Sequence, residues 1–129
     1  MAQAKKILVV DDEAGVRRLM EAVLKKEGYE THLAASGNEA LDKVKETQFD
    51  LAILDILIPS PNGLEVFQFL KNAYPKLKVV IVSGLSAYNK NFFDFVIGGS
   101  ADAIVEKPLR PANLRQLVAS VLAPVSAPA

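Results

Sequence analysis

The sequence predicts a single α/β domain in which helices cover both faces of a parallel sheet. Five short apolar segments, rich in β-branched residues, alternate with five segments whose apolar residues recur at helical spacing. Strands that are joined through helices run parallel, and right-handed crossovers then produce a doubly wound fold. The chain has 129 residues, of which 50% are hydrophobic, so its length suits one domain with a buried core.

The N-terminal half supplies two strands and two helices. Residues 7–10 form a continuous apolar run, as expected for a strand that is covered on both faces. Apolar residues at helical spacing follow over 16–24, and Gly28 stands where a helix C-cap glycine belongs. A weaker strand is expected at 29–34. The Ser-x-x-Glu sequence at 36–39 is a capping box, which predicts the start of the second helix.

The C-terminal half continues the same alternation. Proline and glycine residues mark a loop at 59–63, and Pro111 suits the first position of the last helix. The elements expected around them are strands at 51–54, 79–82 and 103–105, and helices around 66–70, 88–97 and 114–122.

Composition excludes several classes of function. The chain has no cysteine, which removes disulfides, thiolate metal sites, iron–sulfur clusters and cysteine nucleophiles. Its 15 basic and 15 acidic residues give no net charge, so nothing indicates a nucleic-acid or membrane surface. No apolar run is long enough to cross a membrane, and the N-terminus lacks the apolar core of a signal peptide. We therefore expect a cytoplasmic protein.

Acidic residues follow the first and third predicted strands, at the edge where an open α/β sheet binds its ligands. Asp11 and Asp12 come after the first strand, and Asp55 comes after the third. Three carboxylates repel one another unless a cation joins them, and an all-oxygen site suits a hard ion such as Mg²⁺. One of these carboxylates could also act as a nucleophile toward phosphorus.

Two more polar residues follow the neighbouring strands. Ser83 could donate a hydrogen bond to a phosphoryl oxygen, and Lys107 would place a positive charge beside an anionic phosphoryl group. Each candidate has an ordinary structural alternative, such as an acid pair at a helix N-terminus, a loop serine or a solvated lysine. Their convergence on one edge favours a phosphoryl-acceptor site. The polar face of the first helix, including Arg17 and Arg18, is expected to be solvated.

Four motifs resemble those of receiver domains of response regulators in two-component signalling, in particular stand-alone receivers of the chemotaxis-regulator type. They are ILVVDDE at 7–13, LDILIP at 54–59 followed by NG at 62–63, VSG at 82–84 and EKPL at 106–109. The resemblance extends from about residue 6 to 122. It implies a flavodoxin-like sheet of strand order 2-1-3-4-5 with five helices. The receiver domain would span residues 1–123, and the Ala/Pro-rich residues 124–129 would form a tail or the start of a linker.

The resemblance also implies a role for each site residue. Asp55 would accept a phosphoryl group from a sensor histidine kinase or a histidine phosphotransfer protein. Asp11, Asp12, Asp55 and the backbone carbonyl of Leu57 would hold Mg²⁺, and Lys107 would pair with the phosphate, with a cis bond to the proline that follows. The implied switch region, in which Ser83 supplies the hydroxyl, consists of Ser83, Gly84, Ile104 and Pro108.

Two features depart from the family pattern. Ile104 occupies the position of the usual switch aromatic, and isoleucine has no ring to reorient. We expect activation to move the Ser83 loop and the fourth helix with little change at Ile104. Leu57 and Leu85 occupy the positions that flank the hydrolytic water, and neither side chain can hydrogen-bond to it. The phosphorylated form is therefore expected to hydrolyse slowly for its class.

The expected function is a phosphorylation-activated signalling switch that catalyses only its own phosphorylation and dephosphorylation. It would signal to a protein target through the face of the fourth helix, fifth strand and fifth helix, as a monomer or a phosphorylation-dependent dimer. The alternative is a degenerate or excised receiver module that acts as a phosphorylation-independent protein-interaction domain. A haloacid-dehalogenase-like phosphohydrolase is disfavoured because Leu57 replaces its second acid. A flavodoxin is disfavoured because the acids at 11–13 would repel a flavin phosphate.

Overall fold

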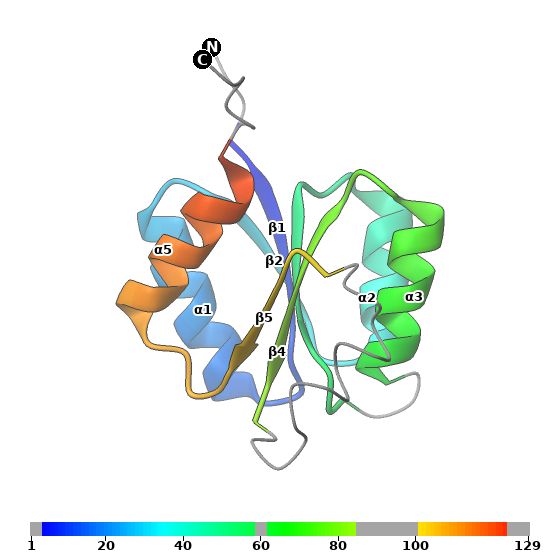
Figure 1. Cartoon of the computed structure of the whole chain (residues 1–129), viewed down its shortest axis with the longest axis horizontal. Coiled ribbons are helices and arrows are strands. Elements are labelled where there is room, and N and C mark those ends of the chain that lie inside the picture. Colours follow the sequence, from blue (N-terminus) through cyan, green and yellow to red (C-terminus); the bar gives the residue numbers. More distant parts are fainter. Residues whose placement is uncertain (1–3, 59–61, 85–100, 124–129) are drawn as a thin grey trace.

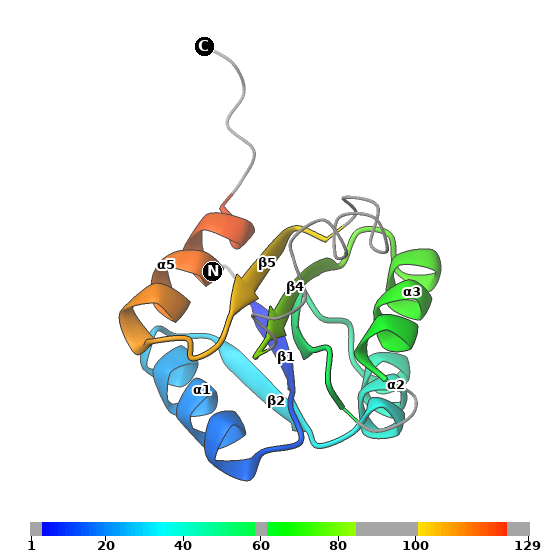
Figure 2. The ribbon, with the colours of Figure 1, turned by 60° about the horizontal axis from the view of Figure 1, so that its bottom comes forward.

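The computed structural model describes residues 4–58, 62–84 and 101–123 of the chain. These residues form a five-stranded sheet in the order β2-β1-β3-β4-β5, in which all neighbouring strands pair in parallel. Helices α1 and α5 cover one face of the sheet, and α2 and α3 cover the other (Figures 1 and 2). The doubly wound fold and its strand order, as expected from the sequence, are confirmed.

The ends of the observed strands lie within one or two residues of the predicted ends, and the observed helices are longer than the predicted ones. The strands are β1 (Lys6–Val10), β2 (Glu30–Ala34), β3 (Leu51–Asp55), β4 (Lys78–Ser83) and β5 (Ala103–Glu106). The helices are α1 (Ala14–Lys26), α2 (Gly37–Glu46), α3 (Gly63–Ala73) and α5 (Pro111–Leu122).

Two sequence expectations fall outside this part of the chain. The helix predicted at 88–97 and the tail predicted at 124–129 both lie outside the described residues, so five helices remain a prediction and four are observed. No helix in the described ranges is long and apolar enough to cross a membrane.

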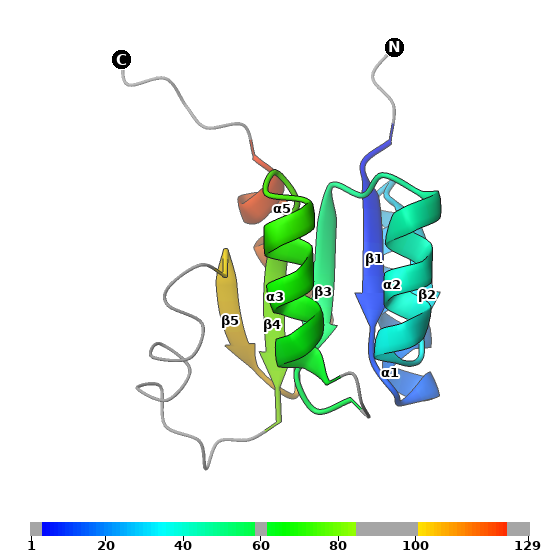
Figure 3. The ribbon, with the colours of Figure 1, turned by 90° about the vertical axis from the view of Figure 1, so that its right-hand side faces the viewer.

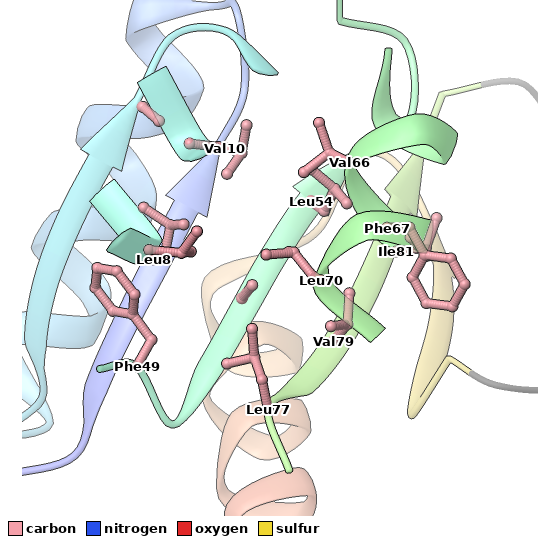
Figure 4. Close-up of a cluster of buried hydrophobic side chains, with 14 of the residues drawn as sticks. Leu8, Val10, Phe49, Leu54, Val66, Phe67, Leu70, Leu77, Val79 and Ile81 are labelled. Carbon is pink, nitrogen blue, oxygen red and sulfur yellow. The ribbon is translucent and has the colours of Figure 1, made fainter. Parts of the chain in front are cut away.

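The three central strands are buried on both faces, as their continuous apolar sequences predict. Because side chains alternate along a strand, each central strand contributes to two separate cores. The core beneath α2 and α3 contains Leu8, Leu54 and Ile81 from β1, β3 and β4, packed against Val66 and Leu70 of α3 (Figures 3 and 4). The core beneath α1 and α5 includes Ile7, Val9, Ile53, Val80, Leu24 and Leu114.

The strand at the β5 edge buries one face only. Ala103 and Val105 pack against the core of α1 and α5, whereas the Ile104 side chain points away from it and is 38% exposed. This alternation is typical of an edge strand with one buried face.

Side-chain caps mark where α2 and α3 begin. Ser36 Oγ accepts from Glu39 N, as predicted, but the Glu39 carboxylate accepts from Ala35 N in place of the N-cap amide. At α3, Asn62 and Glu65 form a complete capping box, with bonds of 3.0 and 3.2 Å. Both Asn62 and Gly63 fall in the loop predicted at 59–63, so this cap is a feature that the sequence did not predict.

Gly63 brings the start of α3 into contact with the end of β3. Its N–H donates to the carbonyl of Ile56 at 3.2 Å. A Cβ at Gly63 would lie 2.3 Å from Ile56 Cα and 2.5 Å from the Asp55 carbonyl oxygen. These are backbone atoms that cannot move aside as a flexible side chain can. Position 63 therefore requires glycine because of close approach.

We expect Gly63→Ala to destabilise the protein by about 3 kcal/mol, because the added methyl group overlaps the backbone of the β3–α3 connection. Urea unfolding followed by circular dichroism measures this change. Gly15→Ala is the matched control, since nothing lies within 4 Å of a Cβ at that helical glycine. The control is expected to gain up to about 1 kcal/mol from helix propensity. Equal stability of Gly63→Ala and wild type would contradict the steric account.

Candidate functional site

Three carboxylates meet at the carboxyl ends of β1 and β3. Asp11 and Asp12 follow β1, and Asp55 is the last residue of β3. One oxygen from each lies within 4.8 Å of the others. Asp11 and Asp55 are only 2% and 4% exposed, whereas Asp12 is exposed. The parallel pairing of β1 with β3 thus brings together the acids that the sequence analysis singled out.

Lys107 bridges the two buried carboxylates. Its Nζ lies 2.7 Å from Asp11 Oδ2 and 2.9 Å from Asp55 Oδ2. Burial by itself lowers the pKa of an ammonium group. The hydrogen bonds and negative charges of Asp11 and Asp55 outweigh that effect, so the pKa of Lys107 is raised above its usual 10.5. The ammonium is therefore charged at neutral pH and offsets one of the two buried negative charges.

Backbone amides hold the other oxygen of each buried carboxylate. The N–H of Glu13 donates to Asp11 Oδ1, and the N–H of Leu57 donates to Asp55 Oδ1, both at 2.9 Å. Each aspartate thus caps the amide two residues further on, a local turn that fixes its side-chain conformation. These two hydrogen bonds were not predicted from the sequence, because the positions of the amides depend on the loop conformation.

The register of β4 and β5 places Lys107. The N–H of Lys107 donates to the carbonyl of Ser83 at 2.8 Å, which extends the ladder between the two strands by one bond. Ser83 itself is 4% exposed and ends β4, one residue beyond Val82, which pairs with Asp55. Gly84 lies beside the Lys107 side chain, and the Lys107–Pro108 peptide bond is cis. Ser83 and Lys107 thus reach the same edge as the acids.

The remaining candidates lie around this centre. Leu57 is 51% exposed and directly follows the Asp55 turn, while Ile104 lies on the open face of β5. Glu106 is exposed at the rim. Leu85 lies outside the described residues.

Arg17 corrects an expectation from the sequence. It was expected to be solvated with the rest of the polar face of α1, but its Nη1 donates to the backbone carbonyl of Asp11 at 2.7 Å. Side chains in a helix lean toward its N-terminus, so an arginine one turn into α1 can reach back to the preceding loop. That geometry is the signal that could have identified it.

The donor set fits a hard divalent cation. One oxygen from each of the three carboxylates lies within 4.8 Å of the others, and a carboxylate can accept several hydrogen bonds or metal contacts at once. Lys107 offsets only one of three negative charges, so the site retains an excess that favours a cation. Mg²⁺ takes few protein ligands and prefers such oxygen donors.

We expect Lys107→Met to lower the free energy of unfolding by about 2 kcal/mol at pH 7, since two buried carboxylates lose their shared cation. The pKa of Lys107 is higher in the folded protein than in the unfolded chain, where it is 10.5. Its contribution to stability is therefore complete at pH values below 10.5, and it disappears as the pH rises through the pKa of the folded state. The difference between wild type and variant is therefore constant from neutral pH to about 9.5 and shrinks above about 10.5.

Urea unfolding of both proteins across this pH range provides the measurement. Lys25→Met serves as the control, because Lys25 is 60% exposed and forms only a helical pair with Glu21. It should change stability by less than about 0.5 kcal/mol. A Lys107→Met protein as stable as the control variant would disprove the central role of the ammonium.

Comparison with known proteins assigns the family. The protein-family model of the response regulator receiver domain matches residues 7–119 of this chain. A CheY-like receiver domain from Methanospirillum hungatei is 31% identical, with a TM-score of 0.85 and coverage of 92% of this chain and 94% of that one. The response regulator TrrA from Thermotoga maritima, solved in complex with Mg²⁺-BeF, is 36% identical, with a TM-score of 0.80 and coverage of 92% and 99%.

A third structure of the same kind is the chemotaxis response regulator CheY4 of Vibrio cholerae. It is 30% identical, with a TM-score of 0.81, and the match covers 92% of this chain and 99% of that one. The family model spans most of the chain, and these structures match almost all of their own length. The protein therefore belongs to the family of response-regulator receiver domains, the phosphorylation-activated signalling domains of two-component systems.

Proposed function

We propose that the protein is a signalling switch that accepts a phosphoryl group on Asp55 in the presence of Mg²⁺. The observation that supports this most strongly is the environment of Asp55: a buried carboxylate bound by one ammonium and one backbone amide, beside two other acids. Such a carboxylate is held in one orientation, and the Lys107 ammonium, together with a cation held by the two other acids, would stabilise an anionic phosphoryl group on it.

The position of Asp55 in the sheet favours it over Asp11 as the acceptor. β3 lies between β1 and β4, so Asp55 has the Asp11–Asp12 pair on one side and Ser83 on the other. A phosphoryl group on Asp55 would therefore stand between the metal-binding acids and the hydroxyl. On Asp11 it would stand between β2 and β3, away from Ser83.

In the proposed reaction an oxygen of Asp55 attacks phosphorus. The bond between phosphorus and the donor nitrogen of a phosphohistidine breaks, and the leaving group takes the electron pair. Asp11, Asp12, Asp55 and the Leu57 carbonyl would hold Mg²⁺, which neutralises charge on the transferring group. Lys107 would pair with a phosphoryl oxygen, and Ser83 would donate a hydrogen bond to another.

Phosphorylation would be transmitted through the backbone of β4 and β5. In the unphosphorylated protein Lys107 binds the Asp55 carboxylate directly, and its N–H binds Ser83. If the Lys107 ammonium moved from Asp55 to a phosphoryl group, the Lys107 backbone would be pulled with it. The hydrogen bond between the Lys107 N–H and the Ser83 carbonyl, the last one between β4 and β5, would then be affected. The resulting shift in population would alter the face of β5, α5 and the predicted fourth helix, the last of which lies outside the described residues.

The proposed partners follow from this cycle. A sensor histidine kinase or a histidine phosphotransfer protein supplies the phosphoryl group. A protein target reads the face that includes β5 and α5, where a groove of about 520 Å³ is lined by Val105, Glu106, Asn113 and Leu117. We propose that this exchange takes place in the cytoplasm, with the protein as a monomer or a phosphorylation-dependent dimer.

Acetyl phosphate with Mg²⁺ is expected to add one phosphoryl group, detected by intact mass. The adduct should be absent in Asp55→Ala and in the presence of EDTA, because both the acceptor and the metal are required. Asp42→Ala is the control, since this exposed aspartate on α2 lies outside the site and should leave phosphorylation unchanged. No adduct on a protein that still binds Mg²⁺ would refute the switch and favour a phosphorylation-independent interaction module.

Because of the Leu57 side chain, we expect the phosphorylated form to be long-lived. It is half exposed beside the Asp55 turn and offers no polar atom to orient an attacking water. We expect Leu57→Asn to speed hydrolysis about tenfold, less than a full acid–base catalyst would because asparagine only orients the water. Decay of the mass adduct gives the rate, with the equally exposed Leu19→Asn on α1 as control. Hydrolysis in Leu57→Asn at the wild-type rate or slower would contradict the prediction.

A further inference from the structure

Arg17 reaches from α1 to the acidic loop. Its Nη1 lies 2.7 Å from the carbonyl oxygen of Asp11, six residues earlier in the chain. Hydrogen bonds from a guanidinium are charge-assisted and stronger than those between neutral groups. The neighbouring Arg18 carries the same charge, is exposed and forms no hydrogen bond or ion pair within the described ranges.

Besides the bond from Arg17, the loop is held by the Lys107 ammonium, which binds Asp11 Oδ2 at 2.7 Å, and by two backbone amides. The Asp11 N–H binds the Ala34 carbonyl at 3.1 Å, and the Glu13 N–H binds the Asp11 side chain. The N-cap of α1 is Glu13, and its side chain makes no capping hydrogen bond. Among the described residues, Arg17 is the residue of α1 whose side chain reaches back to the backbone of this loop.

The carbonyl that Arg17 holds determines the direction of Asp12. The peptide unit between Asp11 and Asp12 is planar, so fixing its oxygen also fixes the plane that leads to the Cα of Asp12. The Asp12 carboxylate is exposed and makes no hydrogen bond to the described part of the chain. Its place near Asp11 and Asp55 thus depends on the backbone that precedes it.

We propose that Arg17 is a positioning residue of the acidic site: it orients the Asp11–Asp12 peptide so that Asp12 faces the other two carboxylates. It thereby sets the affinity of the site for a divalent cation. This inference rests on the metal-binding function proposed above. It adds that the affinity depends on a residue that does not contact the metal.

Two effects of Arg17 on cation binding have opposite signs. Its positive charge repels a cation, so loss of charge alone would tighten binding. Loss of its hydrogen bond would release the Asp11–Asp12 peptide and weaken binding. The direction of the change therefore separates positioning from simple electrostatics.

Isothermal titration of the full chain with Mg²⁺ tests the proposal. Arg17→Met is expected to weaken binding about tenfold, the lower end of what outer-sphere contacts to metal ligands contribute. Arg18→Met reports the effect of charge alone and should change the affinity less than about twofold, toward tighter binding. Arg17→Lys, which keeps a positively charged hydrogen-bond donor, should recover part of the loss.

A double-mutant cycle shows whether Arg17 acts through Asp12. In an Asp12→Asn background, the further change from Arg17→Met should fall below about twofold, because the group that it positions no longer carries a charge. The melting temperature without Mg²⁺ identifies any variant that is simply unfolded. If Arg17→Met is unfolded, the Mg²⁺ affinities of Arg17→Gln and Arg17→Lys relative to wild type decide the question instead.

Unchanged or tighter binding by Arg17→Met would overturn the proposal, as would an undiminished effect of Arg17→Met in the Asp12→Asn background. A wild-type protein that binds no Mg²⁺ would instead refute the metal site of the proposed function. The two failures are therefore distinguishable.

Discussion

The ammonium of Lys107 between Asp11 and Asp55 is the interaction on which the site depends. Two carboxylates that are almost completely buried side by side would repel each other strongly, and burial of each charge is costly in itself. One cation within 3 Å of both offsets these costs. Because the partners are 96 and 52 residues away from Lys107 in the chain, the interaction exists only when β1, β3 and β5 have been brought together in the sheet.

The strand order explains why a lysine serves this purpose. β5 is separated from β3 by β4, so a side chain that starts after β5 must cross the end of β4 to reach Asp55. The long stem of lysine spans this gap, and the bond between its N–H and the Ser83 carbonyl fixes where the stem begins. The strand order therefore requires a long cationic side chain at position 107.

The sequence alone predicted the fold and the meeting of Asp11, Asp12, Asp55 and Lys107. The reason is physical: continuous apolar runs identify central strands, and the carboxyl ends of parallel strands share one edge, so residues after those strands must lie close together. No knowledge of loop conformation was needed for that step. The family motifs then added the strand order, which the described part of the sheet confirms.

Other features could not be predicted because they depend on distances between backbone segments. Asn62 and Gly63 have the composition of a turn, yet the structure uses them as the N-cap and first residue of α3. The close approach of Gly63 to Ile56 depends on how α3 packs, and the contact of Arg17 depends on the path of the acidic loop. Neither feature leaves a periodic or compositional signal in the sequence.

The wide separation of the site residues along the chain has a consequence for biosynthesis. Chains emerge from the ribosome N-terminus first, so Asp11 and Asp55 are available long before Lys107. Until β5 has joined the sheet, Asp11 and Asp55 lack the ammonium that binds both of them. An incomplete or partly unfolded molecule therefore lacks the assembled site, and only chains that have finished folding hold all of its residues together.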